Sequence, residues 1–200
     1  MAITPGSYFS ALRDYLNREY KVTEVENDKV VIKDKIYLPG STTESVKKVR
    51  LQVPGEALVI NLDLKNRRGN SDPLFHFLED NSKPWAKRCD FVIFHLHRKK
   101  ITAICIEFKS RSFPDSLIDQ MKAGVAWCRS LHSVIKHYTS ETKRIRITKF
   151  VLSCHQSPDV YLDNENKYLL RDHTIRHYHY DDIDGMSLDE LENKHVETIG

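Results

Sequence analysis

The feature that most constrains this chain is a pair of apolar segments, 90–97 (DFVIFHLH) and 101–109 (ITAICIEFK), joined by the short basic stretch RKK. Both segments are rich in β-branched and aromatic residues and have the length of buried strands. A buried strand should avoid charged side chains, yet these two carry Asp90, Glu107 and Lys109. Where the fold puts these three charges therefore decides what the segment can do.

A two-residue turn at Arg98 and Lys99 would fix how the two strands pair. Partners across the hairpin then have residue numbers that sum to 197, which places Asp90 opposite Glu107. Directly opposed residues point to the same side of a sheet with Cβ atoms about 5 Å apart, and Lys109 shares that side because it lies two residues further along. We therefore expect two carboxylates and one ammonium group at one end of the hairpin, whereas a slip of one residue would separate the carboxylates. The opposite side receives an apolar set: Phe91, Ile93, Ile104, Ile106 and Phe108.

Two carboxylates at this separation repel each other unless a proton or a cation lies between them. Mg²⁺ is the usual cation for such a pair, because it completes its coordination with water and phosphate oxygens. A lysine beside it can position the attacking water and stabilise developing negative charge. The pattern predicts metal-assisted phosphodiester hydrolysis with Mg²⁺, or Mn²⁺ as a substitute. The alternative is an ion pair between Glu107 and Lys109 that has no catalytic role.

Charge is distributed unevenly along the chain. Residues 83–149 contain 15 Lys and Arg against 5 Asp and Glu, a local charge of +10. Residues 1–82 balance at 12 against 12, and residues 150–200 carry 4 against 11, a local charge of −7. Because the charged hairpin lies inside the basic block, the distribution favours a polyanionic partner such as nucleic acid.

The 200 residues predict a single domain in which helical and strand patterns alternate. Apolar spacing predicts a helix at 7–20 and a longer one at 115–138, directly after Pro114. The order of helix, strands, hairpin, helix and strand predicts an α/β or α+β fold with a central mixed sheet flanked by helices. We expect a core at about 57–155, an N-terminal helix and strands in 1–56, and an acidic C-terminal extension at 156–200. Further strands are expected at 29–38, 45–53, 56–65, 144–155 and 174–180, a short helix from 74, and an acidic helix at 187–195.

Asp90, a hairpin, Glu107-Phe108-Lys109 and then a helix with Gln120 resemble the PD-(D/E)xK nuclease superfamily. The match covers about 90–125, with Cys89 in place of the proline of the motif. The resemblance implies a restriction-endonuclease-like core and a Mg²⁺-dependent endonuclease, with a role in antiviral defence or DNA processing. It also implies that Asp90, Glu107 and the Phe108 carbonyl hold the metal, that Lys109 is the catalytic lysine, and that Gln120 assists from the next helix.

Five further residues are candidates for the site or its surroundings. Arg111, Lys122 and Arg129 flank the proposed site in sequence and are candidates for binding the phosphate backbone. The superfamily often has an additional acidic residue near the N-terminus. Glu19 and Glu79 compete for that place, and the sequence does not choose between them.

Two segments of the acidic extension have alternative interpretations. His173, His177 and His179 alternate along one predicted strand and could form a zinc or nickel site, although the pattern is more typical of a partly exposed edge strand. The acidic helix predicted after them is typical of a solvated helix, with shielding of the basic block or docking on a partner subunit as the alternative.

The remaining features limit where the protein works and what it binds. No apolar run is long enough to span a bilayer and no signal-peptide pattern is present, so we expect a cytoplasmic protein with no membrane partner. The four cysteines lack metal-site spacing, and three of them lie in apolar surroundings that fit reduced core residues: Cys89, Cys105 and Cys154. The leading hypothesis is a nuclease that acts on DNA more than RNA, with a partner subunit or a homodimer left open. The alternative is a non-catalytic nucleic-acid-binding or protein-interaction module that keeps the fold.

Overall fold

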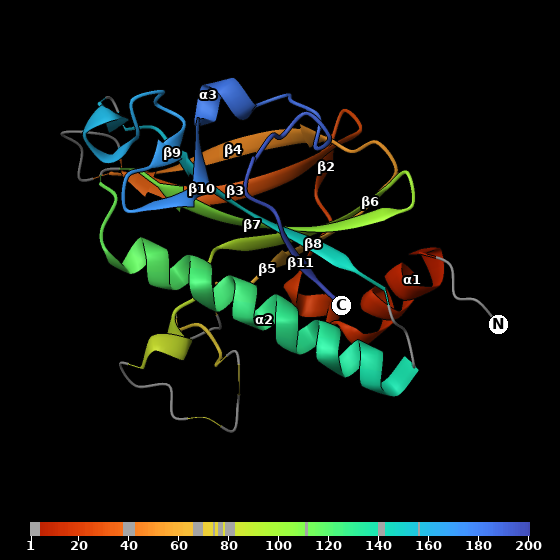
Figure 1. Ribbon diagram of the computed structural model, residues 1–200. Coiled ribbons are helices and arrows are strands. Elements are labelled where there is room, and N and C mark those ends of the chain that lie inside the picture. The colour runs from red at the N-terminus through yellow and green to blue at the C-terminus, as the bar shows by residue number, and fades with distance from the viewer. Residues whose placement is uncertain are drawn as a thin grey trace.

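The computed structural model describes residues 5–37, 43–65, 70–73, 75, 78, 83–110, 112–139, 143–155 and 157–200. The chain forms three layers (Figure 1). Two helices, α1 (Pro5–Tyr15) and α2 (Ser116–Thr139), cover one face of a large sheet, and a smaller sheet covers the other. Short 3-10 helices lie at Arg18–Tyr20, Pro84–Ala86 and Pro158–Tyr161.

The large sheet has eight strands in the order β1-β5-β6-β7-β8-β10-β9, and β11 also pairs with β8. The pairs β7–β8 and β8–β10 are parallel and the others are antiparallel, which confirms the predicted central mixed sheet. Its strands are β1 (Lys21–Val22), β5 (Glu56–Asn61), β6 (Phe91–His97), β7 (Lys100–Lys109), β8 (Ile145–Ser153), β9 (Tyr168–Leu169), β10 (Asp172–His179) and β11 (Glu197–Ile199).

Two of the predicted N-terminal strands belong to a separate sheet. The three-stranded sheet consists of β2 (Val25–Glu26), β3 (Lys29–Tyr37) and β4 (Glu44–Gln52). The sequence predicted that helices flank the large sheet on both faces. On one face the small sheet lies where a helix was expected. Besides it, that face is packed against α3 (Tyr180–Ile183), which is only four residues long.

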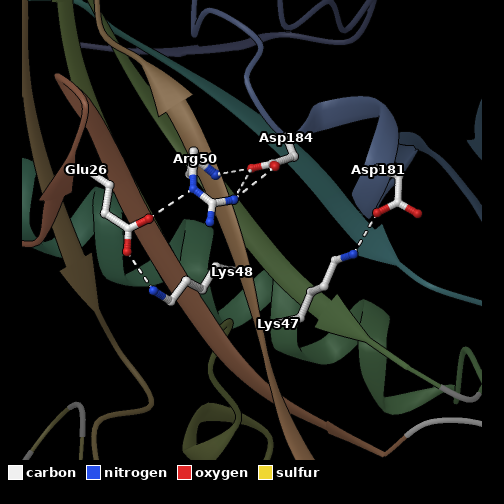
Figure 2. Close-up of polar contacts among 6 residues, drawn as sticks. All are labelled: Glu26, Lys47, Lys48, Arg50, Asp181 and Asp184. Atoms are coloured by element: carbon white, nitrogen blue, oxygen red, sulfur yellow. Dashed lines mark hydrogen bonds and ion pairs between the residues drawn. The ribbon is translucent and has the colours of Figure 1, made fainter.

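Ion pairs join the small sheet to the C-terminal part of the chain (Figure 2). The Arg50 guanidinium donates to Asp184 at 3.1 Å and to Glu26 at 3.0 Å, and the Arg50 backbone N–H donates to Asp184 at 2.7 Å. The Lys47 ammonium donates to Asp181 of α3 at 2.6 Å. Asp181 and Asp184 belong to the predicted acidic extension. Part of the negative charge of the extension therefore attaches it to the small sheet.

The hairpin of β6 and β7 has the predicted register. Phe91 pairs with Ile106 and His97 with Lys100, so that partner numbers sum to 197. Arg98 (φ 47°) and Lys99 (φ 64°) both adopt the left-handed conformation that a two-residue type I′ turn requires. Alternate residues of the hairpin then enter two cores, one under the helices and one under the small sheet.

Helix α2 lies very close to the start of β6. A Cβ atom at Gly124 would come within 2.5 Å of the Cys89 Sγ atom, so only glycine permits this approach. Cys89, Cys105 and Cys128 are all buried in the same core, as expected for reduced core cysteines. Because Cys89 precedes Asp90, this contact sets the height of α2 above the charged end of the hairpin.

Two predictions for the extension are wrong. The acidic helix at 187–195 is absent: Ser187 and Glu190 form a single turn, in which the Ser187 N–H donates to the Glu190 carboxylate at 3.1 Å. The chain then continues extended, because the Asn193 side chain binds the backbone carbonyls of Lys149 and Thr174 and β11 pairs with β8. The predicted edge strand, β10, lies instead between β8 and β9. The short helix expected from 74 lies mostly outside the described residues.

Candidate active site

Asp90 and Glu107 hold each other's strands in place. The Asp90 backbone N–H donates to the Glu107 carboxylate at 3.2 Å, and the Asp90 carboxylate accepts from the Phe108 N–H at 2.6 Å. Strand β6 begins at Phe91, so the Asp90 side chain takes the place of a backbone partner for Phe108. N–H and C=O of one strand residue point the same way, so the Phe108 carbonyl also faces the side of Asp90.

Lys109 completes the predicted group of three charges. Its ammonium group donates to the second Glu107 oxygen, Oε1. Glu107 is 1% exposed, whereas the Lys109 side chain is 17% exposed, so the lysine links a buried carboxylate to the surface. At the end of the hairpin Glu107 therefore contacts both the Lys109 ammonium and the Asp90 backbone, and the Asp90 carboxylate binds the neighbouring Phe108 N–H.

Burial disfavours the charges of this site. It raises the pKa of Glu107 from 4.5 to about 7, although the Lys109 ammonium acts in the opposite direction. Burial also raises the pKa of Asp90 well above its ordinary value, and the neighbouring Glu107 and Asp34 carboxylates add to the rise. A carboxylate pair that retains protons so strongly has too little positive charge around it.

Two further acidic residues act on the pair, and the sequence analysis did not single them out. Asp34 of β3 raises the pKa of Asp90, and Asp63, which follows β5, raises the pKa of Glu107. Burial raises the pKa of Asp34 itself. Asp34 lies on the same face of β3 as the core residues Ile32 and Ile36. An acidic residue on an apolar strand face is the sequence pattern that could have identified Asp34 as a candidate site residue.

The oxygen atoms of this site could bind a divalent cation, but few side chains are available as ligands. Each carboxylate uses one oxygen for a backbone N–H, which leaves Asp90 Oδ1 and Glu107 Oε1 with the Phe108 carbonyl nearby. Mg²⁺ is commonly held by one or two carboxylates together with water and phosphate oxygens. Among the described residues, however, no group of three or more Asp, Glu, His or Cys side chains could hold a metal ion. The cation would also share Glu107 Oε1 with Lys109.

The other predicted site residues are less closely tied to this pair. Gln120 is half-buried on α2. It lies one turn before Gly124, in the first half of the helix, which follows β7 in the chain. Lys122 is exposed, and Arg129 donates to Glu197 of β11 at 3.0 Å. Glu19 is exposed in the first 3-10 helix. Arg111 and Glu79 lie outside the described residues.

The histidines of β10 do not gather around one point. His177 Nε2 lies 2.8 Å from the Ser153 hydroxyl, and burial lowers the pKa of His177 to about 4. His179 accepts from the Asp181 N–H at 3.4 Å, and His173 is exposed. Ser153 is the register partner of Lys109, so the buried histidine pairs with a serine beside the candidate site.

No protein-family model matches this chain, and no curated protein or solved structure matches it either. The arguments for its function therefore rest on its own residues. None of the helices in the described parts of the chain combines the length and apolar character that crossing a membrane requires.

Proposed function

We propose that this protein is a metal-dependent nuclease with a restriction-endonuclease-like core that hydrolyses phosphodiester bonds of nucleic acid, DNA more than RNA. The observation that carries the proposal is the contact of Asp90, Glu107 and Lys109 at the end of a buried hairpin. A structural ion pair needs one carboxylate. A second, half-buried carboxylate beside it raises the free energy of the protein unless it has a further use.

Each residue has a distinct part in this proposal. Asp90, Glu107 and the Phe108 carbonyl would hold Mg²⁺, which supplies Lewis-acid stabilisation of a phosphate and a water of lowered pKa. Lys109 favours the ionised form of Glu107, against the effect of burial, and presents the one partly exposed ammonium of the group to the scissile phosphate. The basic residues of 83–149 would hold the remaining phosphates of the strand.

A second candidate function rests on the same ion pair. Lys109 already occupies Glu107 Oε1, and the described residues offer no third side-chain ligand. Both observations favour a non-catalytic module that binds nucleic acid or protein through this fold. In that case Glu107 and Lys109 only stabilise the hairpin, and removing one of them leaves the charge of the other without a partner.

A cleavage assay with matched variants separates the two functions. The full chain is incubated with DNA and RNA in Mg²⁺, in Mn²⁺ and in EDTA. We expect cleavage only with a metal, and its loss in Asp90→Asn, Glu107→Gln and Lys109→Met, all of which should remain folded and bind DNA. Lys109→Met should keep or strengthen metal binding, because a competing cation is removed from Glu107.

Two exposed residues provide matched controls. Asp14→Asn on α1 and Lys167→Met in the C-terminal extension make the same changes of charge away from the site and should leave cleavage unchanged. If the unaltered chain cleaves neither substrate with any metal, and Glu107→Gln and Lys109→Met both lower the melting temperature markedly, the binding module is the correct function.

A further inference from the structure

One pocket of the described structure lies away from the candidate active site. Its volume is about 420 Å³, and it lies between the sheet face that contacts the small sheet and the chain segment 188–196. Its β7 residues, Lys100, Thr102 and Ile104, precede Lys109 by five to nine residues, which is about 17–30 Å along the strand. Its β7 residues also point to the face opposite to Glu107. The pocket is therefore a separate feature that the proposed nuclease function does not use.

The floor of the pocket is a polar patch on an otherwise apolar sheet face. His95, Thr102 and Arg146 are register partners in one row across β6, β7 and β8, and His97 and Lys100 form the next row. All five line the pocket. Neither Lys100 nor Arg146 has an acidic partner within the described part of the chain. Two cations on adjacent strands with no carboxylate of the described residues within ion-pair distance favour an anionic group above them, although Asp189 and Glu192 line the same pocket.

Two buried polar atoms of the pocket residues lack hydrogen-bond partners among the described residues. They are Thr148 Oγ1 and His97 Nε2, and Thr148 is only 6% exposed. Burying a hydroxyl without a partner costs about 1–3 kcal/mol, so such atoms in a pocket wall indicate a missing partner. Thr148 lies two residues beyond Arg146 on the same face of β8, directly next to the proposed anion position.

His97 indicates the polarity of the other end of the ligand. Its Nδ1 atom lies 3.0 Å from the Pro54 carbonyl, which can only accept, so Nδ1 carries the proton. In neutral His97 the Nε2 atom is then an acceptor, and the nearest carboxylate oxygen, of Asp189, is 3.9 Å away and also an acceptor. Two acceptors at this distance suit an NH2 group that lies beside the line joining them and donates one hydrogen to each.

The segment over the pocket supplies apolar surface as well as charge. Leu188 is buried and Leu191 packs against the core, and both line the pocket with Ile104. The pocket thus combines a cationic end, an end with hydrogen-bond acceptors, and apolar walls. Its volume lies within the usual range for small-ligand sites, roughly 300–1,000 Å³.

We propose that this pocket binds a small organic phosphate of mononucleotide size that also carries N–H donors. Lys100 and Arg146 would bind the phosphate, Thr148 would complete its hydrogen bonds, and His97 with Asp189 would accept from the donor end. The apolar residues of segment 188–196 would cover the flat part of the ligand.

Titration of the full chain with AMP, CMP, adenosine and inorganic phosphate, in buffer with EDTA, tests this site. Calorimetry and melting temperature should both report binding of the nucleotides, and adenosine or phosphate alone should bind at least about tenfold more weakly. Lys100→Met and Arg146→Met should each weaken AMP binding about tenfold. Thr148→Val should weaken AMP binding, while the free protein keeps or gains stability because an unpartnered hydroxyl is removed.

Two controls keep the outcome specific to the pocket. Arg144→Met makes the same charge change two residues earlier, outside the pocket lining, and should leave AMP affinity within about twofold. Glu107→Gln should bind AMP normally. The proposal is overturned if no nucleotide raises the melting temperature at ~10 mM, or if binding survives in Arg146→Met and is lost in Glu107→Gln.

Discussion

Glu107 is a buried side chain whose charge the protein does not fully compensate. One oxygen accepts from a backbone N–H and the other from Lys109, yet burial still raises the pKa of Glu107 to about 7. The neighbouring Asp90 is raised as well, partly by Glu107 itself. The Glu107 carboxyl group therefore favours a bound proton, or a cation in its place. Proton binding and cation binding affect the free energy of unfolding differently.

The first prediction concerns the pH dependence of stability. Between about pH 4.5 and about pH 7 folded Glu107 keeps a proton that the unfolded chain has released, so stability falls as pH rises through that window. Glu107→Gln cannot ionise. Its melting temperature should match that of the unaltered chain near pH 4 and exceed it above pH 7, by a difference in unfolding free energy on the order of 3 kcal/mol at most.

Mg²⁺ should remove this difference, because it favours the ionised carboxylate of the unaltered chain and has less to bind in Glu107→Gln. The measurement is melting temperature against pH for both proteins, with and without Mg²⁺. Taking the difference between the two proteins cancels the titrating groups that do not interact with Glu107, and repeating it in an Asp90→Asn background removes the contribution of Asp90. A variant that is less stable than the unaltered chain above pH 7 would mean that the ion pair with Lys109 outweighs burial.

At the scale of elements, the sequence predicts the hairpin best. A single assumption, a two-residue turn at Arg98 and Lys99, gives the register and thereby places Asp90 beside Glu107, where the Asp90 N–H donates to the Glu107 carboxylate. Neither turn residue is typical of a type I′ turn, so the alternation of apolar residues is what specifies the pairing. The candidate site could be predicted because all three of its charges lie within one hairpin.

The sequence predicts less wherever an element depends on distant partners. Strands β3 and β4 have the pattern of any half-buried strand, and nothing local assigns them to a second sheet. Asp34 approaches Asp90 only because those sheets stack, so its effect on the site could not be read from its own segment. The predicted helix at 187–195 has the Ser187 and Glu190 spacing of a helix start, but pairing of β11 with β8 ends it after one turn.

The second prediction tests the contact between α2 and the start of β6. Gly124→Ala should destabilise the protein by about 1–3 kcal/mol, although alanine favours a helix, because its Cβ would lie 2.5 Å from the Cys89 Sγ atom. In a Cys89→Ala background the nearest atom of that residue is Cβ at 3.4 Å, an ordinary contact. Gly124→Ala should then cost much less.

Chemical denaturation of the four proteins of this cycle gives the coupling energy. Ala126→Gly, at an exposed position of the same helix, measures helix propensity alone and should cost about 1 kcal/mol. An unchanged cost of Gly124→Ala in the Cys89→Ala background would show that the close approach of α2 does not depend on this sulfur.

Over the whole molecule, the basic block and the acidic extension are not two separate regions. Asp181 and Asp184 of the extension pair with Lys47 and Arg50 of the small sheet, and Asp172 pairs with Lys149 of the basic block. On the helix layer, Glu197 of β11 pairs with Arg129 of α2. The extension therefore reduces the positive charge available to a polyanion at one of the predicted phosphate contacts, which favours shielding over a freely solvated tail.

The third prediction follows from that pair. Glu197→Gln should raise DNA affinity several-fold and steepen its salt dependence, because Arg129 loses its internal counter-charge and can neutralise one more phosphate, worth about 0.9 in the slope of log K against log salt. Binding is measured in EDTA over a range of salt concentrations. Glu165→Gln, which removes the same charge beside Lys167, is the matched control and should change affinity little. Arg129→Gln added to Glu197→Gln should abolish the gain. An equal gain in both single variants would mean that net charge alone, and not the release of Arg129, governs binding.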